Sequence, residues 1–202
     1  MSLVDRLSAE RLRAELGALK IGREIVVLEQ TTSTNDYIWQ KATGQATEGM
    51  VVFAEHQTAG RGRRGNRWES AAGKGLWFSA LLRPNIDIKD SPRLTEWAAN
   101  SVAATIQKEL LLKATIKPLN DVLIDGRKVA GVLVEMRAQE NAPHIAILGI
   151  GVNVNHALED FSEELRERAT SLAMLHPGPL DRHLLAVALL RDLDRSYAET
   201  FG

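Results

Sequence analysis

The amino-acid sequence predicts an α+β domain, in which a mixed, largely antiparallel sheet packs against helices on one side. Segments of helical and strand periodicity alternate in the order α-β-α-β-loop-β-α-β-β-β-α. The strands between Val122 and Asn155 are joined by short turns, which suit antiparallel pairing and argue against a doubly wound sheet. A chain of 202 residues can bury one sizeable core, so we treat residues 1–202 as a single domain.

The first quarter of the chain predicts two helices and two strands. Leucines at helical spacing predict a helix over Leu3 to Leu19, within residues 1–20, and a strand follows over Glu24 to Glu29. Ser33 to Asp36 has the form of a capping box, in which the Ser33 hydroxyl accepts a first-turn N–H and Asp36 reaches back. This second helix should run to about Thr43 and lead into a short strand over Met50 to Glu55.

The rest of the chain begins with a long segment that has neither periodicity. Gln57 to Lys74 is rich in glycine and arginine, and a long loop of this kind in a compact domain is usually functional. The elements expected after it are a strand over Leu76 to Leu82, a helix over Ser91 to Leu112, a hairpin over Asn120 to Glu135 around the type I′ turn signal Asp125-Gly126, a strand over His144 to Asn155, and a last helix that buries Ala186, Leu190, Leu193 and Tyr197.

Composition and charge exclude several kinds of chemistry. The formal net charge is -1, so any anion must be bound by a local cluster of cations. The chain has no cysteine, which excludes disulfides, thiolate metal sites and cysteine nucleophiles, and its five histidines are scattered without metal spacing. No signal peptide is found, and no apolar run approaches the ~20 residues that span a bilayer. We therefore expect a cytoplasmic protein with no membrane partner.

The segment Gly60 to Trp68 is the first candidate for chemistry. It holds four arginines and three glycines. Glycine lets the backbone approach a ligand closely, and the forked donors of arginine match phosphate or carboxylate oxygens. The segment is not a Walker loop, because the Gly-Lys-Ser/Thr ending is absent. A phosphate-binding loop, a solvated basic loop and an RNA-binding segment all remain open on composition alone.

Three further segments carry polar groups in places that suit a ligand. Asn120 and Asp121 precede a strand and can offer oxygen ligands to Mg²⁺, while Lys128 on the return strand can meet a carboxylate or phosphate; ordinary turn chemistry is the alternative. Glycines alternate with apolar residues from Gly149 to Asn155, as in strands that a ligand or a backbone approaches, or at a strand edge. The capped helix start at Ser33 presents free N–H groups to a polar ligand.

Together these segments resemble the catalytic domain of biotin-protein ligases. The family pattern Ser-Thr-Asn matches residues 33–35, and Gln-x-x-Gly-Arg-Gly-Arg-x-Gly-x-x-Trp matches residues 57–68. Lys-Trp-Pro-Asn-Asp and Lys-x-Ala-Gly-Ile-Leu-x-Glu correspond to residues 117–121 and 128–135, and Gly-Ile-Gly-x-Asn matches residues 149–153. The motifs occur in the family's order, within a match that spans roughly residues 20–200.

The resemblance implies a class II synthetase-like biotin/lipoate ligase fold and a two-step reaction. The biotin carboxylate attacks the α-phosphorus of ATP to give biotinyl-5′-AMP and pyrophosphate, and a lysine of a biotin carboxyl carrier domain of a carboxylase then attacks the mixed anhydride. ATP and Mg²⁺ are the implied cofactors, and biotin is the substrate. Family members often form homodimers through their sheets, so a homodimer is possible.

The family's residue roles transfer onto matching positions of this sequence. Lys128, Arg63 and Arg61 would be the catalytic residues, and Asp121 would serve a magnesium ion. The residues implied to bind biotin are Ser33, Thr34, Asn35, Gln57, Arg61, Gly62, Arg63, Lys128, Gly131 and Leu133. Those implied to bind the nucleotide are Arg63, Arg64, Trp68, Lys117, Asn120 and Asn153.

The sequence departs from the family pattern at three places. Asn66 stands where the family often has arginine, which would weaken adenylate retention or loop closure. Pro118-Leu119 replaces Trp-Pro and removes a tryptophan from the expected pocket wall. The chain ends at Gly202, without the β-barrel domain that usually follows and without the helix-turn-helix that some members carry in front, so we expect no DNA partner.

Three other functions compete with this interpretation. A lipoate-protein ligase shares the fold and the adenylation chemistry but would lack the Gly60 to Trp68 pattern. A non-catalytic biotin or adenylate sensor is compatible with the departures at Asn66 and Pro118. An RNA-binding protein fits poorly, because basic and aromatic clusters are lacking elsewhere. A cysteine-dependent octanoyltransferase of the same superfamily is excluded by the absence of cysteine.

Overall fold

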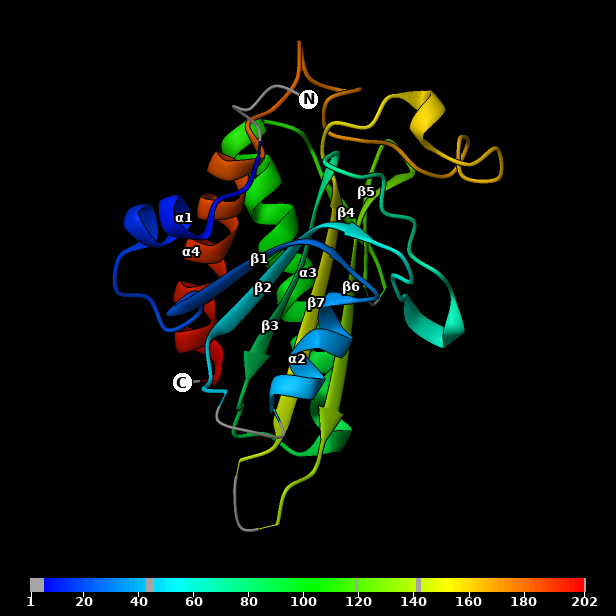
Figure 1. Ribbon diagram of the computed structural model, residues 1–202. Coiled ribbons are helices and arrows are strands. Elements are labelled where there is room, and N and C mark those ends of the chain that lie inside the picture. Colours follow the sequence, from blue (N-terminus) through cyan, green and yellow to red (C-terminus); the bar gives the residue numbers. More distant parts are fainter. Residues whose placement is uncertain (1–5, 43–45, 119, 141–142, 202) are drawn as a thin grey trace.

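A seven-stranded sheet forms the centre of the molecule (Figure 1), whose computed structural model describes residues 6–42, 46–118, 120–140 and 143–201. The strand order is β1-β2-β3-β7-β6-β5-β4. Strands β1 and β2 pair in parallel through the crossover helix α2, and the remaining neighbours pair antiparallel. This mixed, largely antiparallel sheet confirms the predicted fold class.

The strands are β1 (Glu24–Thr31), β2 (Met50–Gln57), β3 (Gly75–Leu82), β4 (Thr115–Lys117), β5 (Asp121–Ile124), β6 (Arg127–Arg137) and β7 (Ile145–Asn153). The helices are α1 (Ala9–Leu16), α2 (Thr34–Ala42), α3 (Ser91–Leu110) and α4 (Arg182–Phe201), and short 3₁₀ turns occur at η2 (Arg63–Gly65), η3 (Ile88–Asp90) and η4 (Leu158–Asp160).

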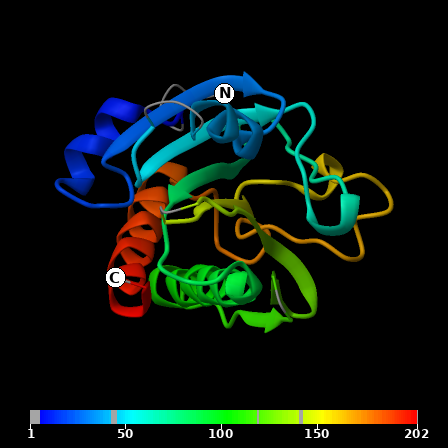
Figure 2. The same ribbon diagram turned by 90° about the horizontal axis from the view of Figure 1, so that it is seen from below.

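Helices cover both faces of the sheet, and the predicted one-sided arrangement is wrong for α2. Helices α1, α3 and α4 bury one face, whereas Ile38 and Trp39 of α2 pack against Val52 on the other. Figure 2 shows α3 and α4 on one side of the twisted sheet and α2 on the other. Because β2 is buried along almost its whole length, it needs a cover on each face.

Helix boundaries differ from the predicted ones for local reasons. The Ser8 hydroxyl accepts the Arg11 N–H and starts α1, and Gly17 at φ 67° ends it, so the helix is shorter than Leu3 to Leu19. Leu111 takes the left-handed conformation and ends α3 at Leu110. Leu3 and Thr43, the predicted outer limits of the first two helices, lie outside the described residues.

The strand pattern after α3 has one member more than predicted. Strand β4 lies at the sheet edge and pairs with β5, and its exposed, three-residue length explains why periodicity misses it. The predicted type I′ turn is confirmed, because Asp125 and Gly126 have φ values of 50° and 76° between the paired residues Ile124 and Arg127. None of the described helices is long and apolar enough to cross a membrane.

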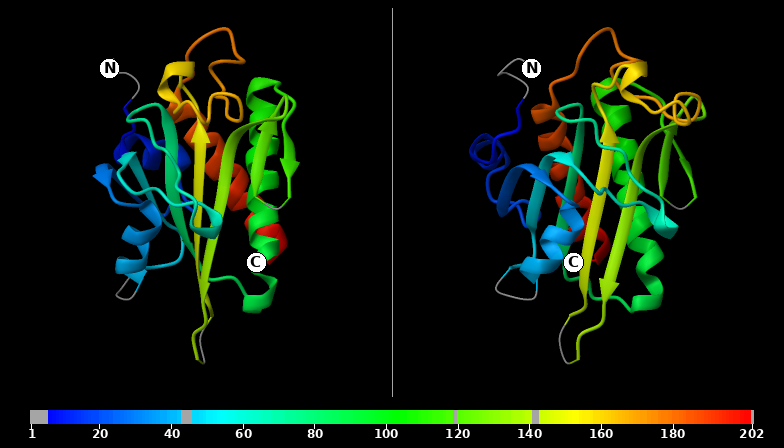
Figure 3. Two further views of the ribbon diagram at one scale, coloured as in Figure 1. Left: turned by 90° about the vertical axis from the view of Figure 1, so that its right-hand side faces the viewer. Right: turned by 45° about the vertical axis from the view of Figure 1, so that its right-hand side comes forward.

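The predicted loop from Gln57 to Lys74 is partly ordered. Gln57 is the last residue of β2, and a bridge between Arg61 and Arg67 closes a hairpin-like lobe around η2. Figure 3 shows this lobe crossing in front of β7 and reaching β6. The lobe therefore lies over the middle of the sheet, with Arg64, Gly65, Asn66 and Arg67 exposed on its outer side.

Candidate active site

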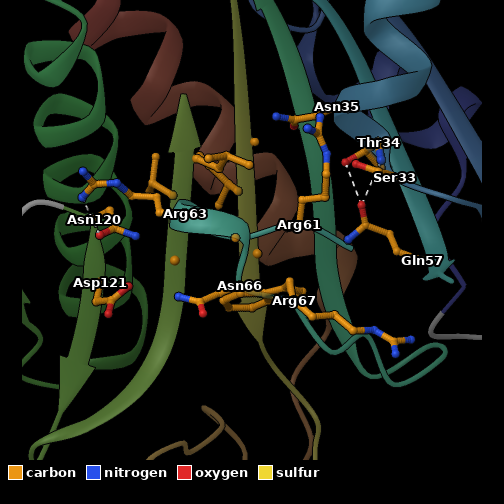
Figure 4. A pocket seen from close by; sticks show the side chains of 18 of the residues that line it. Ser33, Thr34, Asn35, Gln57, Arg61, Arg63, Asn66, Arg67, Asn120 and Asp121 are labelled. Carbon is orange, nitrogen blue, oxygen red and sulfur yellow. Dashed lines mark hydrogen bonds between the residues drawn. The ribbon is translucent and has the colours of Figure 1, made fainter. Parts of the chain in front are cut away.

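A cavity of about 260 Å³ lies between the Arg61–Arg67 lobe and the strands β5, β6 and β7. The start of α2 and the end of β2 close its inner side, and Figure 4 shows their polar side chains facing Asn120 and Asp121 across the lobe. The predicted site residues that line it are Ser33, Thr34, Asn35, Gln57, Arg61, Gly62, Arg63, Arg64, Trp68, Asn120, Asp121, Lys128, Gly131 and Leu133.

A second cavity of about 660 Å³ adjoins the first and contains the other two predicted residues, Lys117 and Asn153. Trp68, Asp121 and Lys128 line both cavities. The residues predicted to bind biotin thus all line the first cavity. Of the residues predicted to bind the nucleotide, Trp68, Lys117 and Asn153 line the second cavity, and Lys128 lines both. Asn153 is nearly buried, and its amide donates to the Thr170 carbonyl at 3.0 Å.

The inner end of the first cavity is a fixed set of uncharged hydrogen-bonding groups. The Gln57 Oε1 atom accepts from the Thr34 backbone N–H at 2.9 Å and from its hydroxyl at 3.1 Å, while Gln57 Nε2 donates to Ser70. The Ser79 hydroxyl lies 2.7 Å from Thr34 Oγ1 and 2.5 Å from Asn35 Oδ1. All of these side chains are buried, so their hydrogen bonds lock the amide orientations.

A charged cluster lies beside this uncharged end. Arg61 forms two parallel hydrogen bonds with Glu135, at 3.0 and 2.7 Å, and also pairs with Asp36 at 2.7 Å. The predicted capping box is therefore wrong for Asp36, because its carboxylate bonds to the loop and not to the first turn of α2. Arg61 lines the cavity as predicted, with its guanidinium already held by two carboxylates.

Arg63 and Lys128 are two further cations that line the first cavity, together with Arg64 and Arg67. Arg63 Nη1 donates to Asn120 Oδ1 at 3.1 Å, from the start of η2. Lys128 Nζ lies 2.6 Å from Asp121 Oδ1 and 5.2 Å from the centre of the Trp68 ring. Arg63 is therefore hydrogen-bonded to a neutral amide and Lys128 is paired with one carboxylate. An incoming anion can replace either partner.

The glycines of β6 and β7 leave space in which other side chains of this protein lie close to the strand backbone. Gly131 and Gly151 are paired across β6 and β7, and a Cβ atom at either would lie within 2.8 Å of the Trp68 indole. A Cβ atom at Gly149 would collide with the Asn35 amide. The sequence pattern correctly indicates a close approach, but in this structure the approaching groups are Trp68 and Asn35.

The second cavity has an apolar corner with one buried histidine. His156 lies between Trp77 and Phe161, with its ring centre 5.6 and 5.0 Å from theirs. Burial lowers the pKa of His156 to about 4, although the nearby Asp160 carboxylate acts in the opposite direction. The imidazole is therefore neutral at pH 7.

Sequence reasoning missed several residues that build the site. The sequence motif gives Glu135 no role, the local pattern predicts only a helix cap for Asp36, and Ser70 belongs to no motif. Ser79 did carry a signal, since it is the one hydroxyl in the otherwise apolar strand β3. The second cavity is bounded by the irregular segment 156–169, in which no periodicity could indicate a binding role.

The magnesium prediction rests on two oxygen-bearing side chains. Asn120 and Asp121 are adjacent, but the Oδ1 atom of each already contacts a cation, Arg63 and Lys128 respectively. Within the described part of the chain, no group of three or more histidine and carboxylate side chains could hold a metal alone. Mg²⁺ usually keeps water and phosphate ligands and takes one or two carboxylates, so the pair fits an ion that arrives with a nucleotide.

The sequence matches the model of the Biotin/lipoate A/B protein ligase family over residues 27–153, more than half of its length. The chain belongs to this family. Among curated relatives, it is 36% identical to the bifunctional ligase/repressor BirA of Bacillus subtilis over 96% of this chain and 60% of the relative. It is also 36% identical to the biotin--[acetyl-CoA-carboxylase] ligase of Mycobacterium tuberculosis over 93% of this chain and 70% of the relative.

Solved structures of family members share the fold. The biotin protein ligase from Aquifex aeolicus in complex with biotin and ATP superposes with a TM-score of 0.76 at 28% identity, covering 89% of this chain and 73% of that one. A putative lipoate protein ligase from T. acidophilum with bound lipoic acid has a TM-score of 0.64 at 15% identity, covering 87% of this chain and 85% of that one, and shows likeness of fold alone. The chain spans about 60% of the length of the BirA relatives it matches.

Proposed function

We propose that this chain activates biotin with ATP as biotinyl-5′-AMP and transfers the biotinyl group to a lysine of a biotin carboxyl carrier domain. The observation that carries the proposal is the pair of adjoining cavities that meet at Lys128. One has a locked, uncharged hydrogen-bonding end, and both are reached by cations. A ligand that is neutral and polar at one end and a carboxylate at the other fits the first cavity, and ATP fits the second.

The uncharged end suits the ureido ring of biotin, which has two N–H donors and one carbonyl acceptor. Ser33, Thr34, Asn35 and Gln57 offer acceptors and donors there without a net charge. Gly62, Gly131 and Leu133 line the same cavity and would contact the bicyclic ring and the valerate chain. The biotin carboxylate would then lie near Arg63 and Lys128.

The first step forms a bond between a biotin carboxylate oxygen and the α-phosphorus of ATP, and pyrophosphate leaves with the electrons of the broken P–O bond. Arg63 and Lys128 would stabilise the negative charge that develops on the phosphoryl oxygens, since arginine and lysine donors are strongest where water is excluded. Arg64, Trp68, Lys117, Asn120 and Asn153 would contact the nucleotide. Mg²⁺ bound with ATP near Asp121 would neutralise phosphate charge.

In the second step the acceptor lysine amine attacks the acyl carbon of the mixed anhydride, and AMP leaves. The chain's main contribution here is position and exclusion of water, because the anhydride hydrolyses when solvent reaches it. The Arg61–Arg67 lobe lies over the first cavity and can serve both purposes. The homodimer, which only the family resemblance suggests, and the cytoplasmic location, which the sequence predicts, both stay predictions.

The test is biotin-dependent exchange of pyrophosphate into ATP, followed by transfer of biotin to a purified carrier domain. We expect exchange with biotin and labelling of the carrier lysine. Exchange with lipoate but not with biotin would replace the proposal by a lipoate-activating enzyme. Tight biotin binding without any exchange would indicate a sensor, and exchange without transfer would contradict the second step alone.

A further inference from the structure

We propose that Glu135 is a positioning residue, which fixes the Arg61–Arg67 lobe to the sheet and orients Asn35 in the wall of the first cavity. The inference deepens the proposed function and depends on it only for the identity of the ligand. Glu135 lies on β6, Arg61 on the lobe and Asn35 on α2. One carboxylate therefore joins three parts of the site that are far apart in the sequence.

Both oxygens of Glu135 are used. Oε1 accepts from Arg61 Nη1 at 3.0 Å, and Oε2 accepts from Arg61 Nη2 and from Asn35 Nδ2, each at 2.7 Å. A bidentate pair holds both the distance and the plane of the guanidinium, which a single contact does not. The side chain of Glu135 is 28% exposed, so water screens this pair only partly.

The same carboxylate sets the direction of a hydrogen-bond chain. An amide has one donor end and one acceptor end, so directing Nδ2 of Asn35 to Glu135 turns its Oδ1 toward Ser79, 2.5 Å away. The Ser79 hydroxyl therefore donates to Asn35 Oδ1 and can only accept at its 2.7 Å contact with the Thr34 hydroxyl, which also lies 3.1 Å from Gln57 Oε1. Glu135 thereby influences the groups at the uncharged end of the cavity without lining that cavity.

Asp36 provides a matched comparison. Its carboxylate pairs with the same Arg61 Nη2 atom at 2.7 Å, but it makes one contact where Glu135 makes two, and it does not contact Asn35. Its side chain is 40% exposed. Neutralising Asp36 removes one negative charge beside Arg61, as neutralising Glu135 does, and leaves the bidentate pair in place. A purely electrostatic effect on Arg61 would make the two variants similar.

The first experiment measures how often the lobe opens by the rate at which trypsin cleaves it, because the lobe contains four arginines. Cleavage after Arg61, Arg63, Arg64 and Arg67 is followed by mass spectrometry in ligand-free wild type, Glu135→Gln and Asp36→Asn. We expect cleavage of the lobe about 10-fold faster in Glu135→Gln and less than ~3-fold faster in Asp36→Asn, since proteolysis follows the population of the open segment. Cleavage after the exposed Arg168 should stay unchanged.

Two results would overturn the proposal. One is lobe cleavage at the wild-type rate in Glu135→Gln; the other is faster cleavage at every site together with a lowered Tm, which would indicate general destabilisation. A second readout is the Kd for biotin alone, by calorimetry. We expect Glu135→Gln to weaken it roughly 10-fold and Glu135→Asp to restore part of the loss. If wild type binds no biotin, the proposed function fails, while proteolysis still decides the role of Glu135.

Discussion

Lys128 and Arg63 differ from Arg61 in the number of negative partners that hold them. Arg61 is bonded to two carboxylates, Lys128 pairs with Asp121 alone, and Arg63 contacts the neutral amide of Asn120. A cation without a carboxylate partner attracts an anionic ligand more strongly, because no neighbouring negative charge offsets its field. Arg63 and Lys128 are therefore the side chains whose loss should most reduce stabilisation of the reaction's negative charge.

We expect Arg63→Ala and Lys128→Ala each to slow biotin-dependent pyrophosphate exchange at least ~10-fold, about 1.4 kcal/mol in barrier. The measurement is the initial exchange rate at saturating biotin and ATP. Lys113→Ala removes an exposed cation outside both cavities and serves as the matched control. Wild-type rates in either site variant would show that the reacting centre lies elsewhere.

At the scale of elements, regular segments with strong periodicity could be predicted from the sequence and the lobe could not. The strand Leu76 to Leu82 and the Asp125-Gly126 hairpin turn occur as expected, because local patterns specify them. The face that α2 covers depends on the parallel pairing of β1 and β2, a long-range contact that no local pattern contains.

The site shows the same division between local and long-range information. Ser33, Gln57 and Lys128 could be identified because their motifs lie in order along the chain, and all three line the first cavity. The contacts of Glu135 could not be predicted, since they depend on Arg61 and Asn35 meeting β6 in space. A motif specifies residue types along the chain, but it does not contain the partners that other elements bring to them.

The paired glycines Gly131 of β6 and Gly151 of β7, against which Trp68 lies, lead to a prediction for these two strands. A Cβ atom at Gly151 would lie 2.5 Å from Trp68 Cε2, so Gly151→Ala must displace the indole that separates the two cavities. We expect pyrophosphate exchange to fall at least ~10-fold with a change in Tm of only a few degrees, because the strand itself tolerates alanine.

Gly178→Ala is the matched control for that variant, since a Cβ atom there meets nothing within 4 Å. Exchange at the wild-type rate in Gly151→Ala would mean that the position of Trp68 does not matter for the reaction. Equal loss in both variants would point to a general effect of the substitution on folding.

At the scale of the whole molecule, a buried ion pair joins distant parts of the chain. Arg182 at the start of α4 is fully buried and donates to Glu55 of β2 at 2.7 Å and to the Gly75 carbonyl of β3 at 3.1 Å. The second oxygen of Glu55 accepts the Leu7 backbone N–H. The N-terminal segment, two central strands and the last helix therefore meet at one carboxylate.

Removing one partner of such a pair leaves an uncompensated buried charge. We expect Glu55→Ala to lower the free energy of unfolding by about 3–5 kcal/mol, measured by urea denaturation at pH 7. Glu164→Ala removes one side of the exposed pair with Arg168, and its cost should stay below ~1 kcal/mol. A cost for Glu55→Ala as small as that of Glu164→Ala would contradict the structural role of the buried pair.

His156 makes the stability of the molecule depend on pH in a definite direction. The buried imidazole has its pKa lowered to about 4, whereas an unfolded histidine titrates at 6.5. Between these values the unfolded chain binds a proton that the folded chain does not, so falling pH favours unfolding. The free energy of unfolding is highest above pH 6.5, and the His156 contribution lowers it by up to about 3 kcal/mol as the pH falls toward 4.

Replacing His156 by phenylalanine keeps an aromatic ring between Trp77 and Phe161 and removes the titration. Urea unfolding of wild type and His156→Phe at pH 7 and pH 4.5 isolates this contribution from that of the carboxylates, which titrate in both proteins. We expect the variant to become more stable relative to wild type as the pH falls; a difference that stays constant would show that the pKa of His156 is the same in the folded and the unfolded chain.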